Sequence, residues 1–362
     1  MRVLVVNAGS SSLKLSVLED DDVVEQEVLE GEARSADVQE FVERSGSVEA
    51  VGHRIVHGGT DFTGPTLITG SVLERMTALT DLAPLHQPKS LATLHAVAGV
   101  LPDTPAVACF DTAFHATIPP AAHTYALPRE WRRRWPLRRF GFHGLSHAHA
   151  AVRAAEMAGR RIDDMRTVSC HLGAGASVTA IRDGRSVDTT MGFTPLEGLI
   201  MATRSGSVDP GLILWLEQHE SLSSAELAET LEYRSGLLGM AGSSDMREVL
   251  ASAAAGDADA EIAAEAYLHR LRGSIASMTA AMGGLDALVF TGGVGEHSAE
   301  IRSRATHGLD FLGVGIDGTA NESAHPDADI SVESAKVRTL VIVAREDLEI
   351  SREVRQVLSG GG

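Results

Sequence analysis

The 362-residue sequence has little cysteine and no long apolar run. Its two cysteines, Cys109 and Cys170, stand in apolar, strand-like runs, which predicts buried free thiols in a reducing compartment rather than a disulfide framework. No uncharged apolar run is long enough to cross a bilayer, and the first residues lack the apolar region of a signal peptide. We therefore expect a cytoplasmic protein with no membrane partner.

Positive charge is also scarce, because 31 lysines and arginines face 49 aspartates and glutamates, for a formal net charge of −18. This balance argues against nucleic acid or an anionic membrane surface as the main partner. The one basic cluster with aromatic residues, at residues 131–140, is confined to a short stretch of an acidic chain. A phosphate-bearing substrate would need locally placed arginines, lysines or a metal ion to offset the negative potential of the chain.

Two familiar nucleotide motifs are absent as well: no Gly-Lys-Ser/Thr follows a glycine loop, and both G-x-G turns lack a third glycine. The sequence offers instead V-L-V-V-N-A-G-S-S-S-L-K at residues 3–14, an apolar run that breaks at a Gly-Ser turn and resumes with alternation. This pattern predicts a β-hairpin whose turn presents backbone N–H groups, hydroxyls including those of Ser10 and Ser12, and Lys14 to one point, which suits a phosphate. An ordinary Gly-Ser turn is the alternative.

The same layout returns at residues 168–188, and setting Gly173 on Gly9 aligns the two hairpins through the second strand without a gap. A third strand that runs into glycines follows at residues 288–297. Repeats define architecture, and the chain is too long for one ordinary core. We therefore predict an α/β fold with two duplicated ribonuclease-H-like domains facing each other across a cleft, the plan of the actin, hexokinase and heat-shock ATPase superfamily.

Polar residues of the predicted loops supply candidate site residues. Asp111 follows a buried strand, at the end where α/β folds bind ligands, and Arg204 has no acidic neighbour in sequence, which leaves it available for an anion. Arginine forks bind carboxylates, and phosphoryl transfer needs positioning, Mg²⁺ and positive charge. The residue types therefore predict a two-domain phosphotransferase, with a carboxylate acceptor and a nucleotide donor both compatible. The candidates are Asn7, Lys14, Arg54, His86, Asp111, His143, Arg204, Asp245, Arg247 and Glu346.

His143 and His147 are spaced as a zinc-binding helix would place two histidines. No glutamate completes the H-E-x-x-H pattern and no cysteine pair stands nearby, so we do not expect zinc there.

Eight collinear motifs resemble the acetate kinase family over essentially the whole chain: N-A-G-S-S-S-L-K, H-R-I-V-H-G-G, D-L-A-P-L-H-Q-P, F-D-T-A-F-H, F-G-F-H-G-L-S-H, M-G-F-T-P-L-E-G-L, M-A-T-R-S-G-S-V-D-P and F-T-G-G-V-G-E. The resemblance implies reversible, direct in-line phosphoryl transfer from ATP to acetate, giving acetyl phosphate and ADP. It also implies Mg²⁺, with Mn²⁺ as a substitute, and a homodimer formed through the second domain. The predicted helix at residues 261–282 would offer an apolar face for that contact.

On the family's plan we expect residues 1–113, joined by a returning helix at residues 348–362, to form the first domain. Residues 114–347 would form the nucleotide-binding and dimerisation domain.

The matching motifs imply roles for single residues on the acceptor side. Arg54 and Arg204 would bind the acetate carboxylate and the transferring phosphoryl group, and His143 would donate to its equatorial oxygens. Asp111 would position the acetate or the metal. The pocket for acetate would comprise Arg54, Val56, Leu85, His86, Phe142 and Pro195.

On the donor side, Asn7 and Glu346 would help to hold Mg²⁺, and Lys14 would approach the nucleotide phosphates. The segments that match the family's nucleotide contacts are His171, Leu172, Gly173, Ala174 and Gly175; Asp245, Met246 and Arg247; and Gly293, Val294, Gly295, Glu296 and His297.

Departures from the family pattern concentrate on the donor side. The family has asparagine at the positions of Ala174 and His297, and Thr-Asn at the position of Ala344-Arg345. A pyrophosphate donor, a propionate acceptor and a nucleotide-binding regulatory protein without turnover therefore remain alternatives. Val56 leaves little room for an acid larger than acetate. One methylene changes the discrimination between two substrates by only about 1–3 kcal/mol, so we expect some activity with propionate. The physiological direction and any regulation stay open.

Overall fold

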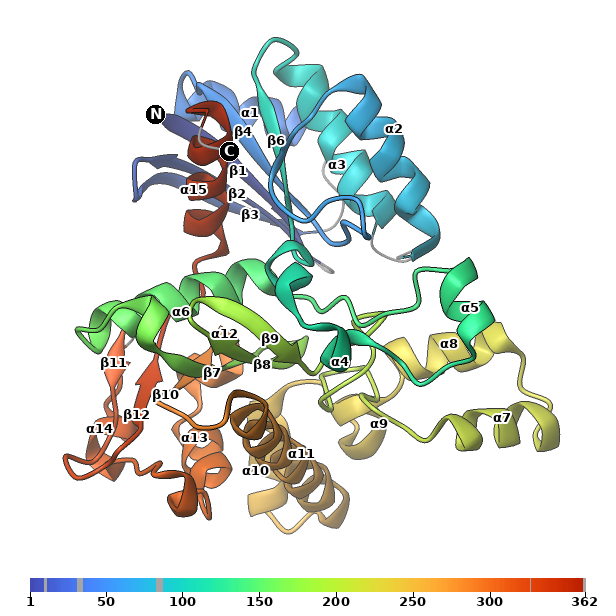
Figure 1. Ribbon diagram of the computed structural model, residues 1–362, viewed down its shortest axis with the longest axis vertical. Helices are drawn as coiled ribbons and strands as arrows, with labels where there is room; N and C mark the ends of the chain where they lie inside the picture. Colours follow the sequence, from blue (N-terminus) through green and yellow to red (C-terminus); the bar gives the residue numbers. More distant parts are fainter. Residues whose placement is uncertain (10–11, 31–34, 83–86, 326, 361–362) are drawn as a thin grey trace.

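A computed structural model of the chain describes residues 1–9, 12–30, 35–82, 87–325 and 327–360. It contains two six-stranded mixed sheets, one above the other in Figure 1, with helices on their faces. Among these residues, none of the helices has the length and apolarity needed to span a membrane.

The first sheet holds the N-terminal hairpin. Its central strand β1 pairs antiparallel with β2 and parallel with β4, which pairs parallel with β6, so that the order is β3-β2-β1-β4-β6-β5. The strands are β1 (Arg2–Ala8), β2 (Ser12–Glu19), β3 (Asp22–Glu30), β4 (Ala50–Ile55), β5 (Thr66–Leu67) and β6 (Ala106–Phe110).

The second sheet repeats this plan in the order β9-β8-β7-β10-β12-β11, with β7 antiparallel to β8 and parallel to β10. Each sheet thus has a hairpin on one side of its central strand and parallel strands on the other, which confirms the predicted duplication. The strands are β7 (Arg166–Leu172), β8 (Ala176–Arg182), β9 (Arg185–Thr189), β10 (Ala287–Thr291), β11 (Ala328–Asp329) and β12 (Arg338–Val341).

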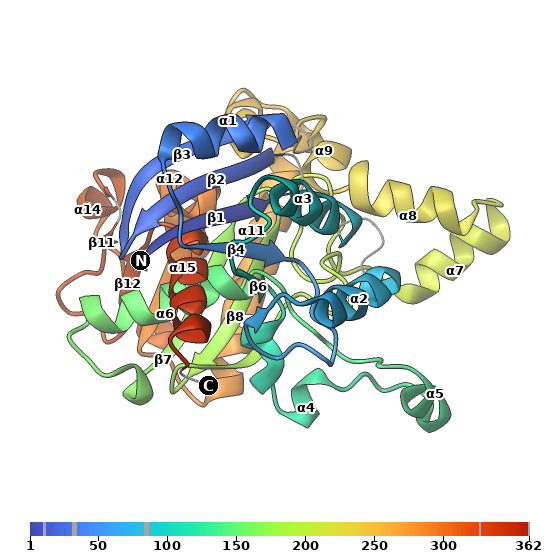
Figure 2. The ribbon, with the colours of Figure 1, turned by 90° about the horizontal axis from the view of Figure 1, so that it is seen from above.

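Strand β1 is buried on both faces because its apolar residues are consecutive. Val3 and Val5 pack with α15 (Glu346–Leu358), whereas Leu4 and Val6 pack with α1 (Ser35–Ser45) and α3 (Gln87–Val100) on the opposite face. Figure 2 shows α1 lying across β2 and β3, with α15 on the other side of the sheet. Helix α2 (Gly70–Ala78) lies beside α3.

The second sheet is covered on one face by α10 (Met246–Ala254) and α11 (Ala258–Met282) and on the other by α6 (Gly144–Met157). Leu268, Leu271 and Ile275 of α11 are fully buried in this core. Most of the apolar face that we considered for a dimer contact therefore packs inside the chain, whereas Ile262 of the same helix is 60% exposed. Helices α6 and α15 pack against each other between the two sheets (Figure 1).

Smaller elements complete the second half of the chain: α4 (Pro120–His123), α5 (Arg129–Arg134), α7 (Pro210–His219), α8 (Ser224–Tyr233), α9 (Gly236–Ala241), α12 (Gly292–His297), α13 (Ala299–Thr306) and α14 (Gly318–Glu322). Asp209 caps α7 by accepting from the Gly211 N–H, and Pro210 is its first residue, as their order in the sequence predicts. Both cysteines are fully buried free thiols, also as predicted.

Candidate active site

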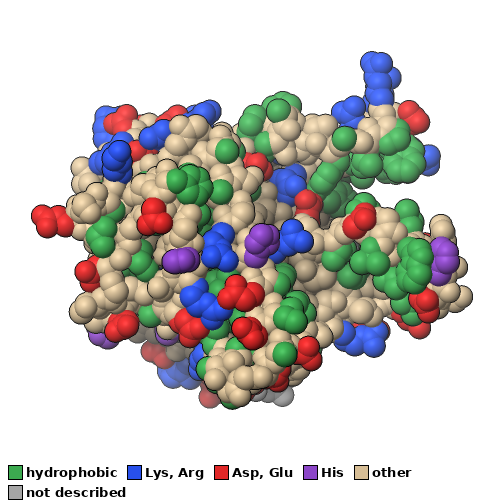
Figure 3. Space-filling view, turned by 90° about the horizontal axis from the view of Figure 1, so that it is seen from below, with side chains coloured by type: hydrophobic (Ala, Val, Ile, Leu, Met, Phe, Trp, Pro, Cys, Tyr) green, Lys and Arg blue, Asp and Glu red, His purple; other side chains and the backbone are tan. Residues whose placement is uncertain are grey.

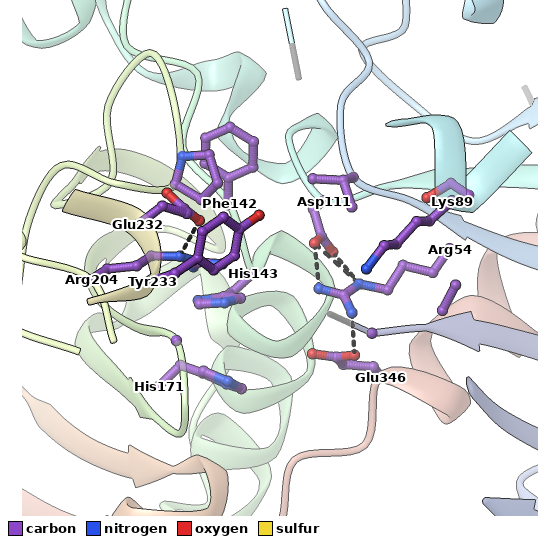
Figure 4. A pocket seen from close by; sticks show the side chains of 16 residues that line it. Arg54, Lys89, Asp111, Phe142, His143, His171, Arg204, Glu232, Tyr233 and Glu346 are labelled. Carbon is purple, nitrogen blue, oxygen red and sulfur yellow. Dashed lines mark hydrogen bonds and ion pairs between the residues drawn. The ribbon is translucent and has the colours of Figure 1, made fainter. Parts of the chain in front are cut away.

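A cavity of about 290 Å³ opens between the two sheets and collects side chains from both halves of the chain (Figure 4). Most of the predicted acceptor residues lie in its wall. Its lining comprises Ala8, Gly9, Arg54, Val56, Lys89, Ser90, Asp111, Phe142, His143, His171, Gly175, Pro195, Arg204, Glu232, Tyr233 and Glu346.

On the side of the first sheet, Arg54 is the centre of an ionic cluster. Its Nη2 donates to Asp111 Oδ2 at 2.7 Å, and its Nη1 donates to Asn7 Oδ1 at 3.1 Å and lies 3.8 Å from Glu346 Oε2. Asn7 Nδ2 in turn donates to that Glu346 oxygen at 2.7 Å. Adjacent parallel strands bring Asn7, Arg54 and Asp111 to one edge of the sheet, and the start of α15 adds Glu346.

Burial and the arginine act in opposite directions on the two carboxyl groups of this cluster. Burial raises the pKa of Asp111, and the neighbouring Arg54 offsets only part of this rise. Burial also raises the pKa of Glu346, but Arg54, His171, the Asn7 hydrogen bond and Lys14 together lower it below its usual value. Glu346 is therefore the carboxylate of the pair that holds its negative charge more firmly.

Arg204 enters from the side of the second sheet, where its acidic partner is a residue distant in sequence. Its Nε donates to Glu232 Oε1 at 2.5 Å, and Glu232 is buried at the end of α8. The two residues are 28 positions apart, so local sequence could not pair them. The sequence did contain one indication. An acidic residue in the last turn of a helix interacts unfavourably with the helix dipole, so Glu232 is expected to have a role other than stabilising α8.

His143 stands opposite Arg54 in the cavity wall (Figure 4). A Cβ added to Gly175 would lie 3.2 Å from His143 Nε2 and 3.5 Å from Arg204 Nη1, so both nitrogens converge on the second glycine turn. The absence of a side chain there leaves space for a ligand beside both donors.

Burial, followed by the positive potential of His171, Arg54 and other neighbours, holds the pKa of His143 well below its usual value. A neutral imidazole at this site can donate one N–H without first losing a proton. His147 is also buried, and its two ring nitrogens contact the hydroxyls of Ser169 and Ser177. Both histidines of the i,i+4 pair therefore contact hydroxyl groups in the structure.

The apolar part of the wall is formed by Val56, Phe142 and Pro195, as predicted. Leu85 and His86 lie outside the described residues. The structure adds Lys89, Ser90 and Tyr233, which the sequence did not single out. Lys89 lies in the first turn of α3, where a positive charge opposes the helix dipole, so it carries the same kind of signal as Glu232.

Next to the second glycine turn lie two further cavities, of about 320 and 400 Å³, which share Gly173, Ala174, Asp245, Met246 and Val294. The larger one adds Arg247, Gly293, His297 and Ser298. The three predicted nucleotide segments thus meet at one place, beyond Gly175 and His171 of the first cavity. Asp245 caps α10 and pairs with Arg247, whose Nη2 lies 2.5 Å from its Oδ2.

Three of the predicted nucleotide-binding residues make contacts inside the protein: Leu172, Gly295 and Glu296. Leu172 is fully buried in the core, and Glu296 Oε1 accepts from the Gly292 and Ala344 N–H groups, both at 2.9 Å. The Gly295 carbonyl accepts from the buried Arg302. Lys14 is the register partner of Asn7 across the first hairpin. Ser10 and the side chain of Ser12 fall outside the described residues.

Arg345, a departure from the family pattern, is not among the residues that line the first cavity. Its Nε donates to Asp347 Oδ1 at 2.9 Å on the side of α15 that faces α6. Its charge thus lies in a different cavity from the first one, which its neighbour Glu346 lines.

The carboxylate of Glu346 in the wall of the first cavity and the neighbouring Asn7 amide carry oxygen atoms of the kind that Mg²⁺ binds. Within the described residues, no group of three or more His, Cys, Asp or Glu side chains could hold a metal. Mg²⁺, however, takes one or two carboxylates and completes its octahedron with water and substrate phosphates. An ionised Glu346 beside the Asn7 amide supplies such a partial set.

Comparison with known proteins finds the Acetokinase family model over residues 32–352. An acetate kinase from Carboxydothermus hydrogenoformans is 38% identical over 99% of both chains, and one from Nostoc punctiforme is 47% identical over 88% of this chain and 78% of its own length. Two crystal structures superpose with a TM-score of 0.91. These are an acetate kinase from Porphyromonas gingivalis, 35% identical over 99% of both chains, and a propionate kinase from Francisella tularensis, 34% identical over 98% of this chain and 99% of its own.

Proposed function

The chain belongs to the acetokinase family, and from this premise we propose that it is an acetate kinase that transfers the γ-phosphoryl group of ATP to acetate. The observation that carries the proposal is the convergence of Arg54, Arg204 and His143 around a small apolar wall. Two arginines and one neutral donor match the charge that spreads over the oxygens of a transferring phosphoryl group.

In the proposed reaction a carboxylate oxygen of acetate attacks the γ-phosphorus in line, and the bond from that phosphorus to the bridging oxygen of ADP breaks. The acetate methyl packs against Val56, Phe142 and Pro195, which fixes the direction of attack. No general base is required, because acetate arrives ionised at neutral pH. Asp111 therefore acts by holding Arg54 in place, through its two-oxygen contact with the guanidinium.

On the donor side, Asn7 and Glu346 would hold Mg²⁺, which neutralises the β- and γ-phosphates when bound. Lys14 approaches the phosphates from the first hairpin. The segments around Gly173, Asp245 and Gly293 would bind the nucleoside, as their shared cavity supports. Water is excluded when the two halves close on the substrates.

The first experiment measures hydroxamate-trapped acetyl phosphate from acetate and Mg²⁺, with ATP and pyrophosphate as parallel donors. Arg54→Ala and Arg204→Ala are each expected to reduce turnover at least 10²-fold, because each removes charge that stabilises the transition state. Arg161→Ala is the matched control, since that side chain is 78% exposed in a surface ion pair. Near-normal activity of either cavity variant would contradict the site.

The donor is tested in the same assay. Ala174 and His297 line the nucleotide cavity where the family has asparagines, so a change of donor is the alternative with a specific observation behind it. Acetyl phosphate formed with pyrophosphate alone would show that ATP is not the donor, while the assignment of the acceptor residues would be unaffected. Binding of ADP without any product would favour a regulatory protein.

We further propose a cytoplasmic homodimer, with residues 1–113 and 348–362 as one domain and residues 114–347 as the other. Helix α7 projects from the body in Figure 1, and Figure 3 shows apolar side chains gathered in that region. Leu212, Leu214 and Trp215 of this helix are each about half exposed. Light scattering of the protein and of Leu214→Glu tests this surface, and an unchanged dimer in the variant would exclude α7 as the contact.

A further inference from the structure

A separate cavity of about 310 Å³ lies where α6 and α15 meet, and we call it the hinge cavity. Helix α6 supplies His149 and Arg153 to its wall, whereas Arg345 and Arg352 come from the start and the middle of α15. Since α6 packs on the second sheet and α15 on the first, this cavity is lined by elements from both halves of the chain (Figure 1).

The charges around the hinge cavity are unevenly paired. Arg153 contacts both acidic residues of the lining, with Asp327 at 2.6 Å and Glu156 at 2.9 Å. Arg345 pairs with Asp347 through Nε, and Arg352 pairs at longer distances, with Asp21 at 3.4 Å and Glu349 at 3.9 Å. Both acidic residues of the lining are thus engaged by one arginine.

Two polar nitrogen atoms of the residues that line the hinge cavity lack a partner in the described part of the chain, as does one carboxylate oxygen each of Asp347 and Glu349 on the adjoining part of α15. Among the described residues, nothing hydrogen-bonds to the buried atoms His149 Nδ1 and Arg345 Nη2, and His149 is only 6% exposed. Burial lowers the pKa of His149 to about 4, so that its ring is neutral and offers one N–H donor. Buried polar atoms without partners are rare, and each requires a water, an ion or a ligand to explain it.

We propose that the hinge cavity binds a small oxyanion with two or more negative charges, held by Arg345, Arg352 and His149. Guanidinium groups bind phosphates and carboxylates with paired hydrogen bonds, and the cavity volume is at the lower end for small-molecule sites. The shared chemistry admits a phosphorylated or a dicarboxylic metabolite.

The position of the site gives it a regulatory consequence, and this step rests on the proposed function. Arg345 faces the hinge cavity, whereas its neighbour Glu346 lines the cleft and is the proposed Mg²⁺ ligand. An anion bound to both α15 and α6 changes the equilibrium between the open and closed arrangements of the two halves. It changes the position of Glu346 at the same time. By linkage, its occupancy changes the apparent affinity for Mg²⁺, and Mg²⁺ changes the affinity for the anion by the same factor.

Titration calorimetry of the full-length protein, saturated with Mg²⁺, ADP and acetate, tests the site with inorganic phosphate and succinate as probes. We expect saturable binding of at least one probe, weakened at least tenfold in Arg345→Gln and in Arg352→Gln. Arg345→Lys, which keeps the charge, should retain most of it, and Arg161→Gln should match the wild type. Thermal midpoints of all variants establish that they are folded.

Equal affinity in all five proteins would place the anion elsewhere and overturn the proposal, as would the absence of saturable binding of either probe. The probe that binds distinguishes the phosphorylated from the dicarboxylic class. Calorimetry does not depend on turnover. Anion binding by a protein without acetate kinase activity would therefore support the hinge site and refute the proposed function. Normal turnover without anion binding would refute the hinge site alone.

Discussion

His143 and His147 contact the same hydroxyl group, since Ser177 Oγ lies 3.0 Å from His143 Nδ1 and 2.8 Å from His147 Nε2. Ser169 Oγ lies 2.9 Å from His147 Nδ1. With both rings neutral, one consistent set of protons runs from Ser169 through His147 and Ser177 and leaves the proton of His143 on Nε2. That nitrogen is the one beside Gly175 in the cavity.

Ser177→Ala is expected to lower kcat about tenfold with little change in KM for acetate. The variant removes the hydroxyl that selects the tautomer of His143, and one hydrogen bond contributes up to about 1.5 kcal/mol, close to a factor of ten in rate. Steady-state kinetics of the wild type, Ser177→Ala and Ser177→Thr measures this. Unchanged kcat in the alanine variant, or no recovery in the threonine variant, would show that the tautomer is set in another way.

Glu232→Gln should reduce kcat/KM for acetate by about tenfold to a hundredfold, because the amide holds the Arg204 guanidinium less firmly than the carboxylate does. Glu232→Asp should retain more activity, since it keeps the charge. Glu229, which is exposed and pairs with the exposed Arg234, provides a control as Glu229→Gln. Equal activity of Glu232→Gln and that control would mean that Arg204 needs no carboxylate.

Val56→Ala should raise the ratio of kcat/KM for propionate to that for acetate by about tenfold. The substitution clears space in the apolar wall next to Phe142 and Pro195 for one additional methylene, which is worth about 1–3 kcal/mol. Parallel assays with both acids measure the ratio in wild type and variant. A ratio that stays constant would place the limit on acyl length at another residue.

Stability should fall as the pH is lowered from about 6.5 to about 4. Burial lowers the pKa of His53, His57, His115 and His149 to about 4, so in this window the unfolded chain binds more protons than the folded one. Each histidine then lowers the free energy of unfolding by up to about 1.4 kcal/mol for each pH unit of acidification. Glu353 opposes this trend, because burial raises its pKa to about 8 and its protonation favours the folded state as pH falls.

Urea denaturation at pH 7, 6 and 5 measures this slope. The four histidines outnumber Glu353, so the free energy of unfolding should decrease, and Glu353→Gln should make the decrease steeper. A free energy that is constant or rises towards pH 5 would contradict the assignment of neutral, buried histidines.

Most of the architecture follows from the sequence because it rests on local patterns. The alternation and glycine turns at residues 3–14 and 168–188 predict both hairpins, and the duplicated strand order agrees with them. Asp111, at the end of an apolar run, could be placed at a sheet edge for the same reason. Most of the acceptor-side residues carried over from the family then fall into one cavity, and the nucleotide segments meet at another.

The tertiary structure alone decides which side chains meet. Glu232 pairs with Arg204, which is 28 residues away, and the apolar face of α11 packs mostly in the core. Residue spacing indicates neither a long-range pair nor what an apolar face packs against. Arg345 and Glu346 are neighbours in sequence yet line different cavities, because successive residues at the start of α15 point in different directions. Sequence determined the elements and the chemical groups; packing of the two halves determined which groups act together.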